Sequence, residues 1–135
     1  MKAIVVGCGR LGAILAWRMV EQGLEVVVLD PDPGAFHRLS DPARVRGIAG
    51  NGTHLQVLRE AGAEECAVFA AVTNSNPINI AAALVARKHF KVPKVLVRVS
   101  DPERVGLYEQ EGFHVVCPTD SAAKAALALV ASEQV

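Results

Sequence analysis

The residues best placed to do chemistry are the glycines of a short loop, Gly7 to Gly12, which reads Gly-Cys-Gly-Arg-Leu-Gly. The loop directly follows an apolar run over residues 3–6, where a buried strand would end and a helix would begin. In such a unit the unpaired amides at the helix start face a phosphate group, and the helix dipole favours its negative charge. The spacing therefore predicts a phosphate site at the start of the first helix.

Each residue of this loop has its own expected task. Gly7 lets the chain turn sharply out of the strand, Gly9 leaves room for a pyrophosphate, and Gly12 lets the helix lie close on the sheet. Arg10 and Leu11 complete the loop. We expect the Arg10 guanidinium to clamp the phosphates rather than to lie solvated on the surface.

An acidic residue, Asp30, ends the next apolar run, 18 positions after Gly12. At this spacing a carboxylate can accept hydrogen bonds from both hydroxyls of a ribose. It would repel a 2′-phosphate, and the neighbouring Pro31 supplies no cation to offset that repulsion. The pair predicts NAD, NADH or an adenosine nucleotide such as ATP or ADP as the ligand, in preference to NADP.

Asn51, Gly52 and Thr53 follow the third apolar run, where a dinucleotide site places its adenine. Gly52 permits a close approach, and Asn51 can bind the edge of a base. For Asn51 an ordinary turn into a helix is an equally good interpretation. Thr53 has a second task, because with Gln56 it fits a capping box at the start of a helix.

Thr73 and Asn74 follow the fourth apolar run, beside the glycine loop, so they can reach a phosphate or the second sugar. Capping of the helix near Pro77 is the competing use, and for Thr73 we favour ligand contact.

Arg98 ends the otherwise apolar fifth run, where an unpaired guanidinium would be costly. Two partners are open for Arg98: a ligand phosphate, or a structural pair with Asp101 or another carboxylate.

The elements that must position these residues are apolar runs that alternate with helical patterns. This alternation is typical of an α/β fold with a parallel sheet and helices on both faces. A right-handed, doubly wound, Rossmann-like sheet of six strands has the order 3-2-1-4-5-6 and brings the candidate residues to one edge. The predicted strands are Lys2 to Val6, Glu25 to Asp30, Val45 to Ala49, Ala67 to Val72, Lys94 to Val99 and His114 to Cys117.

Turn and capping residues mark the helix ends. Asp32, Asn76 and Asp101 each precede a proline suited to the first helical position, so each is expected to cap a helix. Three glycines that follow helical segments are suited to end them. These glycines are Gly23, Gly62 and Gly112, and the predicted helices are Arg10 to Gln22, Pro33 to Leu39, His54 to Ala61, Pro77 to Lys88, Pro102 to Glu111 and Ser121 to Ala131.

Composition narrows the classes of function. The 135 residues predict one domain, 1–135, with no room for a full substrate domain. The balance of 14 basic and 14 acidic residues disfavours nucleic acid as a partner. The three cysteines form no CxxC pair, which favours a reduced, cytosolic setting, and the four scattered histidines predict no metal site. No apolar stretch approaches the roughly 20 residues needed to cross a bilayer.

Two functions are consistent with these residues. A ligand-controlled regulatory module is favoured, because a complete cofactor fold leaves no residues for a substrate pocket, and no catalytic residue is assigned. The alternative is a small NAD-dependent oxidoreductase, or the cofactor domain of a split dehydrogenase. Hydride transfer also needs a positioning cation and an acid or base, for which only Arg98 and His114 can be nominated.

Five segments recur together in one known family: Gly7 to Gly12, Asp30, Gly50 to Thr53, Thr73 with Asn79, and Arg98 to Pro102. In this the whole chain resembles the amino-terminal domain of the potassium-transport regulators called TrkA-N, KTN or RCK. The resemblance implies a cytoplasmic module at the inner face of the membrane that binds NAD(H), ATP or ADP. It also implies a membrane-embedded Trk/Ktr-type transporter or channel subunit as the partner.

The resemblance assigns roles residue by residue. It carries phosphate contact onto Arg10, ribose contact onto Asp30 and adenine contact onto residues 51–53. Asn51 and Gly52 replace the Asp and Ala that are usual in the family.

The last predicted helix, Ser121 to Ala131, is rich in alanine and carries Leu127, Leu129 and Val130. Such a helix needs a surface to bury against, and the chain's own sheet is one candidate. In the family the helix crosses to a neighbouring subunit. The resemblance therefore implies a homodimer, or a ring-forming homo-oligomer built from dimers.

Overall fold

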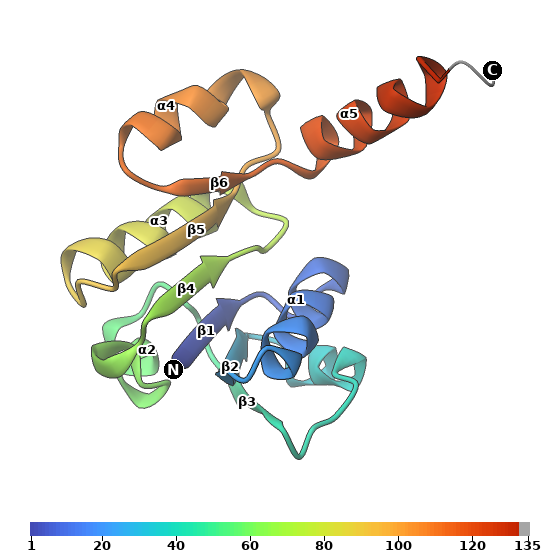
Figure 1. The fold of residues 1–135 in the computed structure, drawn as a ribbon. Coiled ribbons are helices and arrows are strands. Elements are labelled where there is room, and N and C mark those ends of the chain that lie inside the picture. Colours follow the sequence, from blue (N-terminus) through green and yellow to red (C-terminus); the bar gives the residue numbers. More distant parts are fainter. Residues whose placement is uncertain (133–135) are drawn as a thin grey trace.

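The computed structural model describes residues 1–132 and contains a six-stranded parallel sheet (Figure 1). The strand order β3-β2-β1-β4-β5-β6 confirms the predicted doubly wound, Rossmann-like topology. The first three strands have the predicted bounds, and the other three are one or two residues shorter. The strands are β1 (Lys2–Val6), β2 (Glu25–Asp30), β3 (Val45–Ala49), β4 (Val68–Ala71), β5 (Lys94–Arg98) and β6 (His114–Val116).

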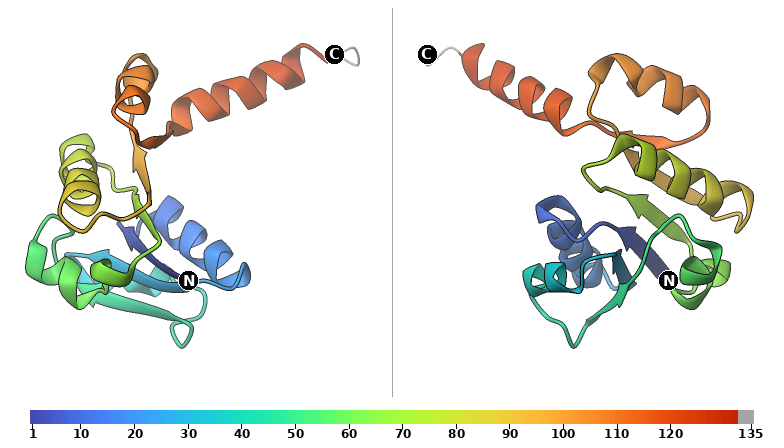
Figure 2. Two further views of the ribbon diagram at one scale, coloured as in Figure 1. Left: turned by 60° about the vertical axis from the view of Figure 1, so that its left-hand side comes forward. Right: turned by 180° about the vertical axis from the view of Figure 1, so that it is seen from behind.

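Helices cover both faces of the sheet (Figure 2). Helix α1 (Arg10–Glu21) lies on one face, while α2 (Leu55–Glu60) and α3 (Asn76–Lys88) lie on the other. The segment expected as a helix after β2 is a 3-10 helix, and the one expected after β5 is divided. The remaining elements are η1 (Pro33–Arg38), η2 (Ala63–Glu65), η3 (Pro102–Arg104), α4 (Val105–Gln110) and α5 (Pro118–Val130).

The core has two layers, one on each side of the sheet. Ile4 and Val6 of β1 pack with Phe69 in the layer under α2 and α3, whereas Ala3 and Val5 pack in the layer under α1. Successive residues of a strand point to opposite faces, so a strand buried on both sides is apolar throughout. This double burial anchors the strand ends from which the loops of the candidate site emerge.

Helix α5 leaves the body of the molecule (Figures 1 and 2). None of its residues is buried, and Leu127, Leu129 and Val130 are 66%, 73% and 67% exposed. It begins at Pro118, earlier than predicted, and it does not cover the chain's own sheet in this structure. Among residues 1–132, no helix has the length and apolar content needed to cross a bilayer.

The cap predicted at Asp32 is present, but the capping box predicted at Thr53 is not. An Asp32 carboxylate oxygen accepts a hydrogen bond from the Gly34 amide at 2.9 Å. Helix α2 begins after His54, and the Thr53 hydroxyl instead donates to Asn51 Oδ1 at 2.7 Å. The Thr53 prediction is wrong because α2 starts one residue later than a Thr53 cap requires, with His54 at the capping position and no side-chain cap.

The caps predicted at Asn76 and Asp101 are also absent. Ser75 caps α3, since its hydroxyl accepts from the Ile78 amide at 3.3 Å, and Asn76 is the first helical residue. Asp101 makes no capping bond; its carboxylate lies 3.6 Å from the guanidinium of Arg104. In both places the predicted capping side chain has another partner.

Candidate functional site

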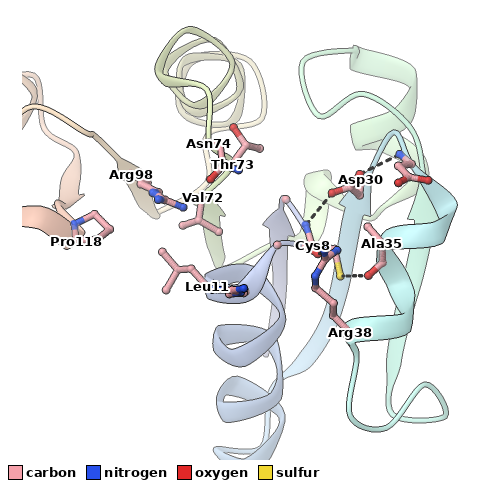
Figure 3. A pocket seen from close by; sticks show the side chains of 14 residues that line it. Cys8, Leu11, Asp30, Ala35, Arg38, Val72, Thr73, Asn74, Arg98 and Pro118 are labelled. Atoms are coloured by element: carbon pink, nitrogen blue, oxygen red, sulfur yellow. Dashed lines mark hydrogen bonds between the residues drawn. The ribbon is translucent and has the colours of Figure 1, made fainter.

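A cleft of about 640 Å³ opens at the carboxyl edge of the sheet, where the connections from β1 and β4 diverge (Figure 3). A smaller hollow of about 330 Å³ adjoins it and is lined by some of the same residues. We call the two together the trough. All predicted site residues except Gly12 and Thr53 line it, namely Gly7, Gly9, Arg10, Leu11, Asp30, Pro31, Asn51, Gly52, Thr73, Asn74 and Arg98.

The glycine loop is closed on its inner side and open toward the trough. Gly7 has a φ of 106°, which side chains rarely adopt, and its amide donates to the Leu29 carbonyl at 2.8 Å. A Cβ added to Gly12 would overlap the Gly7 carbonyl oxygen, so α1 packs directly against the loop. A Cβ added to Gly9 would meet nothing within 4 Å. The space above Gly9 is therefore available to a ligand.

No side chain caps the start of α1, because the capping position is occupied by Gly9, which has no side chain. The first amides of a helix have no partner within the helix, and together with the helix dipole they attract an anion. The start of α1 thus offers donors and positive potential at the place where the loop leaves space.

Asp30 ends β2 with a half-buried carboxylate whose orientation is fixed by the backbone. One oxygen accepts from the Cys8 amide and the other from the Asp32 amide, each at 2.9 Å. A carboxylate oxygen can accept more than one hydrogen bond. Asp30 is therefore held in place with one acceptor site free on each oxygen, which suits two neighbouring hydroxyls.

Three guanidinium groups line the cleft: Arg10 at the start of α1, Arg38 at the end of η1 and Arg98 at the end of β5. Within residues 1–132 none of them forms an ion pair. Arg98 therefore has no structural pair with a carboxylate of residues 1–132, and Asp101 contacts Arg104 instead. Figure 3 shows the Arg98 side chain directed toward the glycine loop.

Arg38 and Asp32 are not among the residues that the sequence pattern selects, yet both line the cleft. The η1 segment folds back over the loop, so that the Arg38 guanidinium donates to the Cys8 carbonyl at 3.4 Å. The available signal is the sequence Asp-Pro-Asp-Pro-Gly at residues 30–34, which marks a chain reversal after β2. It does not indicate which later side chain returns to the loop.

The Thr73 side chain lines the trough, but its hydroxyl is engaged within the protein. It donates to Asn79 Oδ1 at 2.7 Å and accepts from the Ser75 amide at 3.1 Å. Asn79 is fully buried, and its Nδ2 donates to the carbonyls of Thr73 and Arg98, both at 3.0 Å. One amide side chain thus ties together the ends of β4 and β5. The neighbouring Asn74 is exposed on the trough.

The turn after β3 shapes the smaller hollow. Asn51 Oδ1 accepts from the Thr53 amide at 2.8 Å as well as from its hydroxyl, so the turn interpretation accounts for this oxygen. A Cβ on Gly52 would lie 2.5 Å from Cγ1 of Val6, so the turn packs closely on β1. The hollow between them has apolar walls suited to a base, supplied by Val6, Pro31 and Ile78.

The thiol of Cys8 lies beneath the loop and is fully buried. Its sulfur donates to the Ala35 carbonyl at 3.4 Å. Burial, followed by the nearby Asp30 carboxylate, raises the pKa of this thiol, while Arg38 lowers it by a smaller amount. Cys8 therefore packs as a small neutral group that supports the loop from inside.

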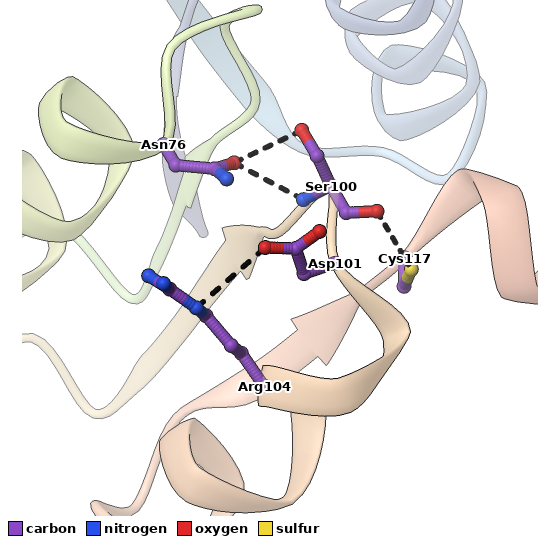
Figure 4. A network of polar contacts seen from close by, with 5 residues as sticks. All are labelled: Asn76, Ser100, Asp101, Arg104 and Cys117. Atoms are coloured by element: carbon purple, nitrogen blue, oxygen red, sulfur yellow. Dashed lines mark hydrogen bonds and ion pairs between the residues drawn. The ribbon is translucent and has the colours of Figure 1, made fainter.

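A second polar network joins the start of α3 to the base of α5 (Figure 4). Asn76 Oδ1 accepts from both the amide and the hydroxyl of Ser100 at 3.1 Å. The Cys117 thiol donates to the Ser100 carbonyl at 3.8 Å. The network positions the loop after Arg98 relative to Pro118, which lines the far end of the cleft.

Residues 3–119 match the model of the TrkA-N domain family. The chain is 42% identical over 116 residues to the Trk system potassium uptake protein TrkA of Streptomyces coelicolor, covering 86% of this chain and 52% of that protein. It is 34% identical over 103 residues to the TrkA of Vibrio alginolyticus, covering 76% of this chain and 22% of that protein. The chain thus spans about half of the first relative and about a fifth of the second.

Solved structures share the fold at low sequence identity. The TrkA-N domain of the inner membrane protein ybaL from Escherichia coli has a TM-score of 0.83, with 20% identity and 95% of each chain covered. The Kef CTD of Shewanella denitrificans, in AMP-bound form, has a TM-score of 0.81, with 22% identity and 98% and 84% covered. The GsuK channel bound to NAD has a TM-score of 0.70, with 17% identity and 85% and 21% covered.

Proposed function

Because the chain belongs to the TrkA-N domain family, we propose that it is a nucleotide-binding regulatory module that controls potassium transport. Its partner would be a membrane-embedded transporter or channel subunit of the Trk type. The observation that carries the proposal is the trough, in which an open glycine loop adjoins a fixed carboxylate. The relatives named above are potassium uptake proteins, which supports this choice over other uses of the fold.

The ligand would be an adenine nucleotide, namely NAD, NADH, ADP or ATP. The space above Gly9 and the free amides of α1 would hold the phosphates, Asp30 the ribose hydroxyls, and the hollow beside Gly52 the base. Two structural neighbours are described with bound AMP and NAD, which supports this class of ligand. Asp32 adds a second negative charge beside Asp30, and the Arg38 guanidinium supplies a positive charge in the same cleft.

Regulation would follow from nucleotides that favour different arrangements of two or more copies. A ligand shifts such an equilibrium only if its affinity differs between the arrangements. Helix α5 would cross to a second copy within a dimer or a ring of dimers, and residues 1–135 would act as one unit. The module would lie on the cytoplasmic side, attached to the membrane through its partner.

Calorimetric titration with NAD, NADH, ATP and ADP tests the site, with light scattering to follow assembly. Saturable binding is expected, and absence of binding by all four would end the proposal. Asp30→Ala should weaken every adenosine ligand by about 1 to 3 kcal/mol, because the ribose hydroxyls lose their acceptor. Glu21→Ala is the matched control, since Glu21 ends α1 at the opposite edge of the sheet.

We assign no catalytic role to this chain. Hydride transfer could use two groups, Arg98 and His114. Arg98 lines the trough at the carboxyl edge of the sheet, whereas His114 is the first residue of β6 and lies at the amino end of that strand. An acid or base must reach the substrate directly or through one water. Turnover of hydroxy acids or aldehydes, followed by the absorbance of NADH, would reverse this assignment.

A further inference from the structure

The polar side chains of the smaller hollow fall into two sets. Asp30, Thr73 and Asn74 line both the hollow and the larger cleft, so they lie toward the proposed ribose and phosphate positions. Asn51 and Ser75 line the hollow alone. A base held in the hollow would therefore have Asn51 and Ser75 as its polar side-chain neighbours.

The orientation of the Asn51 side chain is fixed by the turn that follows β3. Its Oδ1 accepts from the amide of Thr53 at 2.8 Å and from the hydroxyl of Thr53 at 2.7 Å. A backbone amide can only donate, so the atom of Asn51 that faces it must be the oxygen, and both lone pairs of this oxygen are in use. The Nδ2 group of Asn51 has no partner among residues 1–132 and is not buried. Asn51 therefore offers a ligand donors but no free side-chain acceptor.

Ser75 adds a second donor to the hollow. Its hydroxyl oxygen accepts from the Ile78 amide at 3.3 Å as the cap of α3, which leaves its proton to donate. Neither Asn51 nor Ser75 thus provides a free carbonyl or carboxylate oxygen. This matters for a purine, because the 6-amino group of adenine is a donor and is recognised only by an acceptor. Ring nitrogen N7 of every purine, and O6 of a 6-oxopurine, are acceptors.

We propose that the hollow binds purines through a hydrogen bond donated by Asn51, and that it therefore does not select adenine over a 6-oxopurine such as hypoxanthine. The inference rests on the proposed nucleotide site and deepens it by naming the class of base. An O6 atom in place of the amino group meets no fixed side-chain acceptor that would repel it. The apolar walls supplied by Val6, Pro31 and Ile78 contact the two ring systems alike.

Calorimetry with ADP and inosine diphosphate tests the proposal, because these ligands differ only in the 6-substituent and the accompanying proton on N1. The wild type should bind inosine diphosphate no more than about threefold more weakly than ADP. Asn51→Asp keeps one oxygen on Thr53 and replaces Nδ2 by a second oxygen. This variant should favour ADP by about tenfold, since the new acceptor bonds the amino group and repels O6. The added charge weakens both ligands alike and cancels in their ratio.

Asn74→Asp is the matched control, because it adds the same charge at another residue of the hollow. It should weaken both ligands equally and keep the wild-type ratio. The proposal is overturned by a wild type that favours ADP by more than about threefold, by an unchanged ratio in Asn51→Asp, or by the same change of ratio in Asn74→Asp. The wild-type comparison decides the matter even if Asn51→Asp proves unstable in urea. A wild type that binds neither diphosphate would instead refute the nucleotide site itself.

Discussion

At the scale of single residues, Gly9 and Gly12 lack a side chain for opposite reasons. The Cβ position of Gly9 faces open space, whereas that of Gly12 coincides with the Gly7 carbonyl oxygen. We expect Gly9→Ala to change the free energy of unfolding by less than about 1 kcal/mol and to weaken nucleotide binding at least tenfold, because the methyl group occupies the phosphate space.

Gly12→Ala is the matched variant. It should lower the free energy of unfolding more than Gly9→Ala does. The methyl group forces α1 away from the loop, and overpacking of this kind costs about 1 to 3 kcal/mol before any ligand is added. Urea denaturation without ligand and calorimetry with ADP separate the two variants. A Gly12→Ala chain as stable as the wild type would show that the loop is not packed as described.

The buried thiols predict how stability depends on pH. Burial is the main cause that raises the pKa of both Cys8 and Cys66 above the ordinary thiol value. The folded chain keeps these protons at a pH where the unfolded chain loses them, so the stabilisation is complete below the unfolded pKa. It declines as pH rises from about 8.5 toward the raised folded values.

Denaturation at a series of alkaline pH values measures this decline. Cys8→Ala should flatten it in part, because one buried titrating group is gone, and adding Cys66→Ala should flatten it further. An alkaline slope that is the same in the wild type and the double variant would mean that other groups cause it.

At the scale of elements, Asn79 joins the ends of β4 and β5 through a buried amide. Replacement by alanine leaves the Thr73 amide and the Arg98 carbonyl without this partner, and each unsatisfied group costs about 1 to 3 kcal/mol. We expect Asn79→Ala to lower the midpoint of urea denaturation strongly. Asn74→Ala is the control of the same residue type, because Asn74 is exposed and should affect nucleotide affinity more than stability.

The sequence predicts the elements well where apolar runs are bounded by turn residues. The bounds of β1, β2 and β3 follow from such runs, and the sheet order follows from the handedness of the connections. Capping side chains are predicted less well, because they respond to tertiary partners. Asn76 was suited to cap α3 by its position before Pro77, but its oxygen is used by Ser100, which is distant in sequence.

In the candidate site, too, some residues can be predicted from the sequence and others depend on tertiary structure. Residues at strand ends, such as Asp30 and Arg98, can be located from the sequence because parallel strands end at one edge. Arg38 cannot, because its approach to Cys8 depends on how η1 folds back over the loop. Segment η1 is a 3-10 helix, and the spacing of apolar residues does not distinguish it from an α-helix.

At the scale of the whole molecule, α5 stands apart, because no other element of residues 1–132 buries any of its side chains. It projects from the sheet with large apolar side chains exposed, whereas α1 and α3 lie against the faces of the sheet (Figure 2). Exposed apolar groups on an ordered helix indicate an interface. The base of α5 adjoins the far end of the cleft at Pro118.

The chain should therefore form dimers that depend on the apolar residues of α5. Leu127→Asp combined with Leu129→Asp should convert the dimer into a monomer, as measured by light scattering coupled to size-exclusion chromatography. Both leucines are exposed in the single chain, at 66% and 73%, so the substitutions should cost the monomer little stability. Lys124→Ala on the same helix removes only an exposed pair with Asp120 and should leave the dimer intact. A wild-type chain that stays monomeric at high concentration, with and without nucleotide, would show that α5 serves another partner.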